Sequence, residues 1–203
     1  MAGRGGVAAP MNGPVIDLWC WRHPRARGAA GRCIGSTDLP VDPRKARRLA
    51  HRIRQAARRH GLPRVVWVSS LQRAGDVGRW LKRWGWQLRV DARLRELDFG
   101  RWDGRHWNEV PWDEVEAWQS DLLHHAPGGG ESLGALAMRV QRFVHTAAAA
   151  APGPCLLVSH GGWINALLHV PPGITRLAAA DWPAAPRHGT LTRVLRPTQA
   201  GLS

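Results

Sequence analysis

The sequence predicts an α/β domain in which a parallel or mostly parallel sheet is covered by helices. Short apolar runs of strand length alternate along the chain with longer segments of helical periodicity, which is typical of such sheets. The length of 203 residues favours one domain. A domain of this size buries roughly 70% of the surface of its unfolded chain and needs no disulfides or metals. We expect it over residues 15–197, between tails at 1–14 and 198–203.

Five apolar segments are short enough to be strands rather than helices. Residues 15–21 form a mainly apolar run, and VVWV at 65–68 and CLLVS at 155–159 have the composition of buried strands. Residues 88–90 and 191–195 complete the predicted set.

The clearest helix signal covers residues 42–60. Asp42 is a suitable N-cap, Pro43 suits the first helical position, and Gly61 is a typical end signal. The remaining predicted helices cover residues 73–84, 108–123, 132–151 and 162–169.

The charge of the chain is strongly basic. Lysine and arginine together number 29 against 15 acidic residues, and the formal net charge is +14 at pH 7. Such a field attracts anions, whether phosphorylated metabolites, nucleic acid or anionic lipid, although a solvated basic surface has the same composition.

Cysteine usage and hydropathy indicate a cytoplasmic protein with no membrane partner. Cys20, Cys33 and Cys155 lack the spacing of a zinc site or a disulfide framework. The chain contains no run of about 18 apolar residues, and its first residues lack the apolar core of a signal peptide.

Candidate site residues stand where three predicted strands end. In an open α/β sheet, ligands bind beyond the carboxyl ends of the strands. Arg22 and His23 follow the first strand, and Arg73 lies five residues after the second. His160 follows the CLLVS strand directly, and the two glycines after it would let backbone N–H groups approach an anion. The other eight histidines stand at no such strand end, so we assign them no role in this site.

The residues at these positions resemble five motifs of the histidine phosphatase (phosphoglycerate mutase-like) superfamily. The motifs occur in the order of the family and cover about residues 15–170. They are Arg22-His23-Pro24 (family RHG), 69–74 (SS-x-x-R-A), 94–104 (LRE-x-x-FG-x-W-x-G), 127–133 (PGGGESL) and 158–162 (VSHGG).

The resemblance implies a three-layer α/β/α sandwich of the phosphoglycerate mutase-like type and a reaction through phosphohistidine. His23 would attack phosphorus in line with the leaving alcohol. Arg22, Arg73 and His160, with N–H groups near Gly161, would surround the phosphoryl oxygens, because this chemistry depends mainly on positioning and electrostatics. The scheme requires no metal and no cofactor.

The resemblance also implies a carboxylic acid that protonates the leaving alkoxide and later activates water. Glu96 is the favoured candidate, and Asp98 is the alternative, whose other interpretation is a loop cap or a surface charge.

The sequence departs from the family pattern after the first motif. Pro24 replaces the usual glycine; it keeps a carbonyl that could orient the His23 ring but loses an N–H. The Glu-Thr and Asn that usually follow are absent. A third phosphate contact is therefore expected from Arg32, Ser36 or Thr37.

One loop narrows the expected substrate. Residues 31–40 are similar to the G-x-C-Y-G-x-x-D-x-P loop of α-ribazole phosphatase-like members, with Ile34 where tyrosine is usual. This similarity implies a small phosphorylated metabolite such as α-ribazole 5′-phosphate, and a role in cobalamin biosynthesis.

Other functions remain open. A phosphoglycerate mutase or a phosphohistidine protein phosphatase would use the same core, although the short span from Glu96 to Gly130 favours a phosphatase over a mutase. A basic nucleic-acid-binding protein would stack bases on tryptophan. That alternative is disfavoured because Trp19, Trp67 and Trp163 lie in apolar runs and are expected in the core.

A serine hydrolase is a further alternative. Residues 130–134 match G-x-S-x-G, and Asp181 and His188 follow in the order of a catalytic triad. However, a nucleophile elbow needs a strand that feeds the turn. A Gly/Pro loop precedes Ser132, so we predict that Ser132 caps a helix.

Overall fold

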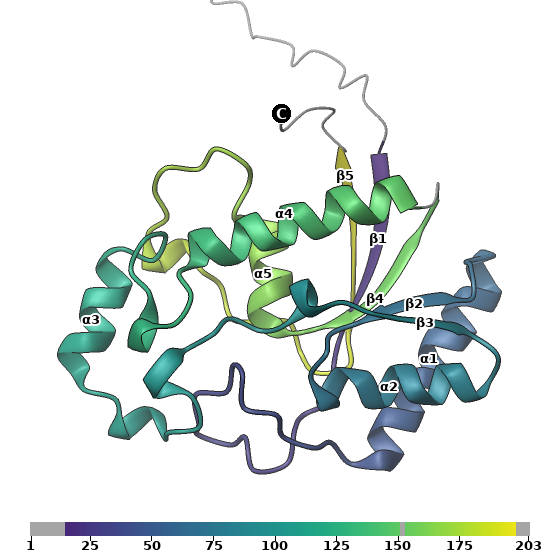
Figure 1. The fold of residues 1–203 in the computed structure, drawn as a ribbon, viewed down its shortest axis with the longest axis horizontal. Coiled ribbons are helices and arrows are strands. Elements are labelled where there is room, and N and C mark those ends of the chain that lie inside the picture. Colours follow the sequence, from purple (N-terminus) through teal and green to yellow (C-terminus); the bar gives the residue numbers. More distant parts are fainter. Residues whose placement is uncertain (1–14, 151–152, 198–203) are drawn as a thin grey trace, which may run out of the picture.

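The computed structural model describes residues 15–150 and 153–197, and the predicted tails lie outside these residues. The central sheet has five strands in the order β3-β2-β4-β1-β5 (Figure 1). β1, β2, β3 and β4 run parallel, and β5 pairs antiparallel with β1 at one edge. The predicted mostly parallel sheet is confirmed. The strands are β1 (Val15–Arg22), β2 (Val65–Val68), β3 (Gln87–Val90), β4 (Cys155–Ser159) and β5 (Leu191–Pro197).

Helices cover both faces of the sheet because successive strand side chains point to opposite faces. Leu18 and Cys20 of β1 are buried in one cluster with residues of α4 and α5, whereas Trp19 and Trp21 are buried in a second cluster with residues of α1 and α2. The result is three layers (Figure 1). The covering helices are α1 (Pro43–His60), α2 (Gln72–Arg83), α4 (Leu133–Ala150) and α5 (Gly161–His169).

The predicted start and end of α1 are confirmed. The Asp42 carboxylate accepts a hydrogen bond of 2.8 Å from the Arg44 N–H. Gly61 ends the helix with a φ of 63°, a left-handed conformation that glycine adopts without steric cost.

The predicted helix over 108–123 is wrong in its extent. The structure has a short 3₁₀ helix, η3 (Trp107–Glu109), followed by the shorter α3 (Trp112–Ser120). Pro111 separates the two, because proline lacks an N–H and disfavours helical geometry in the preceding Val110, which is extended. The other 3₁₀ helices are η1 (Ala92–Leu94), η2 (Gly100–Trp102), η4 (Pro127–Gly129) and η5 (Ala179–Asp181).

Ser132 lies at the start of α4 and not on a nucleophile elbow. Its Oγ accepts a hydrogen bond of 3.2 Å from the Ala135 N–H, and the preceding element is a 3₁₀ turn rather than a strand. The predicted capping role is confirmed, and the strand that a serine hydrolase elbow needs is missing from this position.

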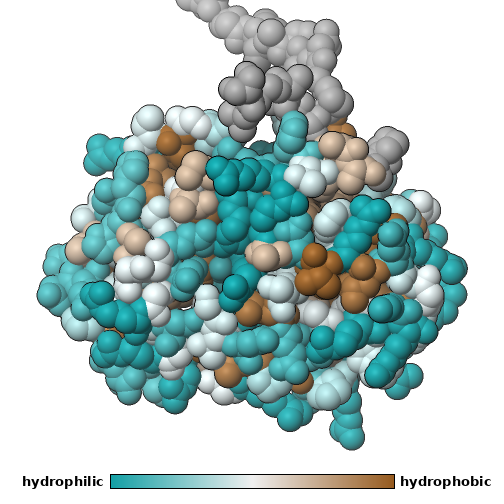
Figure 2. Space-filling model, viewed as in Figure 1, coloured by the Kyte–Doolittle hydropathy of each residue, from teal (hydrophilic) through white to brown (hydrophobic). Residues whose placement is uncertain are grey.

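The surface is mainly hydrophilic (Figure 2). Hydrophilic residues cover most of the face seen in Figure 2, and the apolar ones form small separate groups. None of the helices in the described part of the chain is long and apolar enough to cross a membrane.

Candidate active site

A cavity of about 420 Å³ opens beyond the carboxyl ends of the central strands. Its wall includes Arg22, His23, Arg73, Glu96 and Gly161. Backbone hydrogen bonds between neighbouring strand ends bring these segments together: the His23 N–H donates to the Ser159 carbonyl at 3.0 Å. The sheet topology therefore joins residues that are up to 139 positions apart in the sequence.

The His23 ring is held with a free electron pair on Nε2. Its Nδ1 lies 2.6 Å from the Pro24 carbonyl oxygen. Since a carbonyl oxygen can only accept, Nδ1 carries the proton and Nε2 keeps its lone pair. Burial and the nearby Arg73 hold the pKa of His23 well below its usual value, which keeps the ring neutral. The predicted orientation of His23 by the Pro24 carbonyl is confirmed.

The His160 ring contacts the His23 ring and has the opposite tautomer. The two ring centroids are 4.8 Å apart, and His160 is fully buried. The Arg73 Nε–H donates to His160 Nδ1 at 3.2 Å, so the His160 proton is on Nε2. That Nε2 is buried and has no hydrogen-bond partner within 15–150 and 153–197. Such an orphaned buried donor is rare and calls for an acceptor.

The two arginines are held by backbone carbonyls. Arg73 is almost fully buried and donates from its two terminal nitrogens to the carbonyls of Thr37 and Gly35, at 2.8 and 2.7 Å. Arg22 donates from Nη1 to the Pro186 carbonyl at 2.6 Å. The Arg22 Nε is buried and lacks a partner among the described residues. A second buried donor therefore stands unsatisfied beside His23.

Gly161 lets the start of α5 approach Arg22. A Cβ at this position would lie 2.7 Å from Ala185 Cβ and 2.9 Å from Arg22 Cζ, closer than real Cβ contacts. A larger residue would therefore displace Ala185 and the guanidinium.

Glu96 occupies the start of α5. Its carboxylate accepts from the N–H groups of Gly162 and Trp163 at 3.1 and 3.2 Å, and from its neighbour Leu97 at 3.0 Å. The amides after His160, which we expected to approach a ligand anion, thus bind this carboxylate at two positions. A helix start favours negative charge, so the placement is electrostatically stable.

Asp98 does not line the cavity. It is exposed, and its carboxylate accepts from the Gly100 N–H at 3.0 Å, as a loop cap does. Of the two candidate acids, the structure brings only Glu96 to the cavity.

The residues predicted as a third phosphate contact lie in different places. Arg32 lines the cavity, but it is exposed and donates to the Gly104 carbonyl at 2.7 Å. Ser36 is not part of the cavity wall. The Gly35 and Thr37 N–H groups donate to the Asp103 carboxylate, which fixes the loop on either side of Ser36.

His188 is a third histidine of the site that sequence reasoning missed. Its Nδ1–H donates to the His23 carbonyl at 3.1 Å, and its ring lies 5.3 Å from the His23 ring. Burial and the charge of Arg22 lower the pKa of His188 to about 4. The signal that could have found it is the pairing of the last strand with β1, because Arg22 exchanges backbone hydrogen bonds with Gly189 and Thr190.

Aromatic side chains form a second wall that was also not predicted. The Trp118 ring contacts Phe99 edge-on, with centroids 6.1 Å apart. The indole N–H of Trp118 is buried and has no partner in the part of the chain that the structure describes. The aromatic members of the wall are Phe99, Trp107, Trp118 and Trp182.

Comparison with known proteins agrees with this arrangement. A family model described as the histidine phosphatase superfamily (branch 1) matches residues 18–196, which is most of the chain. The chain belongs to this superfamily. The five motifs, the α/β fold and the cluster around His23 are thus accounted for by one family.

Curated members of the superfamily differ in their named substrates. A glucosyl-3-phosphoglycerate phosphatase of Mycobacterium tuberculosis (strain ATCC 25618 / H37Rv) is 36% identical over 135 residues, which are 60% of this chain and 59% of that protein. A protein named "Probable phosphoglycerate mutase GpmB" from Enterobacter sp. (strain 638) is 31% identical over 154 residues, which are 72% and 70% of the two chains. This chain therefore spans about three-fifths of the first of these relatives.

Solved structures of superfamily members share the fold. The native structure of a mycobacterial glucosyl-3-phosphoglycerate phosphatase superimposes with a TM-score of 0.73 at 28% identity, over 89% of this chain and 90% of that chain. The α-ribazole phosphatase of Shigella flexneri superimposes with a TM-score of 0.70 at 24% identity, over 87% and 89%. The latter likeness concerns the fold alone.

The lowered pKa values of three histidines in the site predict how the stability of the fold depends on pH. His23, His160 and His188 all have lowered pKa values in the fold. Below about pH 6.5 the unfolded chain binds protons that the folded chain does not, and each such proton lowers the free energy of unfolding by up to about 1.4 kcal/mol per pH unit. Urea unfolding at pH 7.5, 6.5 and 5.5 should show this loss of stability on acidification.

The control for this prediction is a pair of histidine variants. His188→Asn should reduce the slope between pH 6.5 and 5.5, whereas the same change at the exposed His169 should leave it unaltered. Equal slopes in the two variants would contradict the assignment.

Proposed function

We propose that this chain is a phosphomonoesterase that forms a phosphohistidine at His23. One observation carries the proposal: the neutral His23 ring lies 4.8 Å from the His160 ring and adjoins Arg22 in the chain, and His160 Nε2–H and Arg22 Nε–H are buried donors that lack partners among the described residues. A phosphoryl group on His23 would offer acceptor oxygens to these donors. Buried polar groups are otherwise almost always paired.

The first step transfers the phosphoryl group to the enzyme. The Nε2–P bond forms as the bond between phosphorus and the leaving oxygen breaks, and Glu96 gives a proton to the leaving oxygen. Arg22, Arg73 and His160 stabilise the charge on the equatorial oxygens.

The second step returns the enzyme to its starting state. Water attacks phosphorus, Glu96 accepts a proton from it, and the Nε2–P bond breaks to release inorganic phosphate. The neutral His23 is suited to both steps, since its lone pair attacks first and its Nδ1–H stays on the Pro24 carbonyl throughout.

We further propose a small phosphorylated metabolite with a planar ring as the substrate, with α-ribazole 5′-phosphate, and hence cobalamin biosynthesis, as the leading case. Two features support it: the resemblance of the loop 31–40 to α-ribazole phosphatase-like members, and the wall formed by Phe99, Trp107, Trp118 and Trp182. Aromatic rings stack on one another with geometry-dependent gains of about 0.5–1.5 kcal/mol beyond area burial.

The aromatic wall yields a prediction for Trp107→Ala. Loss of a stacking surface of about 0.5–1.5 kcal/mol should raise KM for a ring-bearing ester such as α-ribazole 5′-phosphate by roughly 2- to 10-fold. The rise for glycerol 2-phosphate, which has no ring, should be smaller. Steady-state kinetics on the two esters gives the comparison.

Trp112→Ala is the matched control. Trp112 belongs to the same segment of the chain, is 70% exposed and does not line the cavity. Its loss should leave both KM values unchanged. A Trp107→Ala variant with the same KM increase for both esters would contradict ring recognition.

The names of the similar proteins suggest two further activities that the experiment must include. A phosphoglycerate mutase would interconvert 3- and 2-phosphoglycerate instead of releasing phosphate, and a glucosyl-3-phosphoglycerate phosphatase would hydrolyse that ester. A panel of α-ribazole 5′-phosphate, glucosyl-3-phosphoglycerate, 3-phosphoglycerate and a phosphohistidine peptide, with phosphate release and isomerisation both measured, separates these functions. Absence of phosphate release from every ester would refute the phosphatase proposal.

A further inference from the structure

The segment that carries Glu96 lies outside regular secondary structure. It follows the 3₁₀ helix η1 and has neither a helix nor a strand ladder of its own. Its backbone carbonyls must find other partners, since unpaired buried carbonyls are costly. The position of the Glu96 side chain therefore depends on what binds this backbone.

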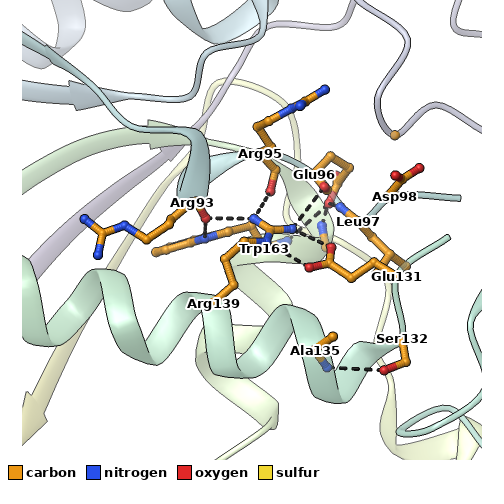
Figure 3. A network of polar contacts seen from close by, with 12 residues as sticks. Arg93, Arg95, Glu96, Leu97, Asp98, Glu131, Ser132, Ala135, Arg139 and Trp163 are labelled. Atoms are coloured by element: carbon orange, nitrogen blue, oxygen red, sulfur yellow. Dashed lines mark hydrogen bonds and ion pairs between the residues drawn. The ribbon is translucent and has the colours of Figure 1, made fainter.

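Arg139 of α4 binds most of these carbonyls (Figure 3). Its Nη1 donates to the carbonyl oxygens of Arg93 and Arg95, at 2.7 and 2.8 Å. Its Nη2 donates to the carbonyl oxygen of Glu96 at 3.2 Å. One guanidinium thus fixes three carbonyls over four consecutive residues.

Two further side chains hold the same segment from the sheet and α5. The Trp163 indole N–H donates to the Arg93 carbonyl at 2.8 Å, and the Ser159 hydroxyl donates to the Leu94 carbonyl at 2.8 Å. Trp163 also gives its backbone N–H to the Glu96 carboxylate. The backbone and the carboxylate of Glu96 are therefore fixed by one connected network.

Glu131 completes the coordination of Arg139. Its two carboxylate oxygens accept from Nε and Nη2 at 2.9 and 2.6 Å, so all five N–H donors of the guanidinium are used. The side chains of Arg139 and Glu131 are only 20% and 18% exposed. The Glu131 N–H donates to the Asp98 carbonyl at 2.8 Å, which ties the other end of the acid segment to the same residue.

We infer that Arg139 and Glu131 are a positioning pair for the proton donor Glu96, a role that rests on the proposed function. The pair does not touch the substrate. The pair sets where the Glu96 carboxylate meets the leaving oxygen. Lysine cannot replace Arg139, because an ammonium has three donors on one atom and lacks the planar fork of a guanidinium. A misplacement of about 1 Å at such a group can cost roughly 10²-fold in rate.

The test uses two esters that differ in their need for an acid. The alkoxide of glycerol 2-phosphate leaves only with a proton, whereas the phenolate of p-nitrophenyl phosphate leaves without one. The comparison uses kcat/KM, which reports phosphoryl transfer and not the later hydrolysis of the phosphohistidine. For Arg139→Lys we expect kcat/KM on glycerol 2-phosphate to fall by roughly 10²-fold, and kcat/KM on p-nitrophenyl phosphate to fall at least tenfold less. Glu131→Gln, which keeps the shape but loses the charge, should show the same bias to a smaller degree.

Arg142→Lys is the matched control, an exposed arginine on the same helix that should keep both rates. A purely structural role would lower the activity on both esters equally. Equal losses on the two esters in soluble Arg139→Lys would therefore overturn the inference; if that variant does not fold, equal losses in Glu131→Gln would do so. Glu96→Gln serves as the reference. If Glu96→Gln loses more activity on glycerol 2-phosphate than on p-nitrophenyl phosphate, but neither pair variant does, only the positioning role is refuted. If Glu96→Gln loses activity equally on both esters, the assignment of Glu96 as the acid is refuted, and the positioning role is refuted with it.

Discussion

His23→Ala should abolish phosphoester hydrolysis. The variant removes the Nε2 lone pair of His23, which is next to Arg22 in the chain and whose ring lies 4.8 Å from that of His160; both neighbours have a buried donor without a partner among the described residues. Loss of a nucleophile that works as a unit with its neighbours lowers kcat by roughly 10⁴-fold or more. Steady-state phosphate release from the best ester of the panel measures the loss.

The intermediate gives an independent readout of the same prediction. Rapid quench of the wild-type chain with a ³²P-labelled ester should trap phosphate that is labile in acid and stable in base, as a phosphoramidate is. His23→Ala should trap none. The control is His169→Ala, since His169 is exposed at the end of α5 and should retain full labelling. Normal turnover by His23→Ala would refute phosphohistidine chemistry at this residue.

Local patterns along the chain were sufficient to predict most of the fold. The cap at Asp42 and the stop at Gly61 are read from neighbouring residues, and α1 begins and ends there. The strands 65–68 and 155–159 are continuous apolar runs, as expected for parallel strands buried on both faces. The prediction failed where a proline at position 111 divided a segment of helical composition.

Only those site residues that follow a strand or belong to a family motif could be predicted from the sequence. His23, Arg73 and His160 each follow a strand, so the edge of a parallel sheet brings them together. His188 escaped prediction because it enters the site through the antiparallel pairing of β5 with β1, which no local pattern announces. Trp118 of α3 was not predicted either, because its contact with Phe99 joins two separate segments of the chain.

Long-range contacts also fix the loop that holds Ser36. The Asp103 carboxylate, 66 residues beyond Thr37, binds the N–H groups of Gly35 and Thr37 on either side of Ser36. An acidic partner so distant in sequence is invisible to motif reasoning. The same distance effect hides the Arg139 network around Glu96.

Glu96→Gln should lower the turnover of alkyl phosphates by roughly 10²- to 10⁴-fold, the usual contribution of a positioned proton donor. The glutamine side chain keeps an oxygen for the amides of Gly162 or Trp163 but cannot release a proton to an alkoxide. The loss should be much smaller for p-nitrophenyl phosphate in the transfer step. Hydrolysis of the phosphohistidine should also slow, so labelled enzyme should accumulate with this ester in a quench experiment.

Asp98→Asn is the control that decides between the two carboxylates. Asp98 is exposed and caps its own loop through the Gly100 N–H, which asparagine can also bind. We therefore expect kcat of Asp98→Asn to remain near that of the wild type on both classes of ester. The opposite result, a large loss with Asp98→Asn and little change with Glu96→Gln, would transfer the proton donor to Asp98. It would also require the loop 96–100 to move on substrate binding, because only Glu96 of the two now faces the cavity that holds His23.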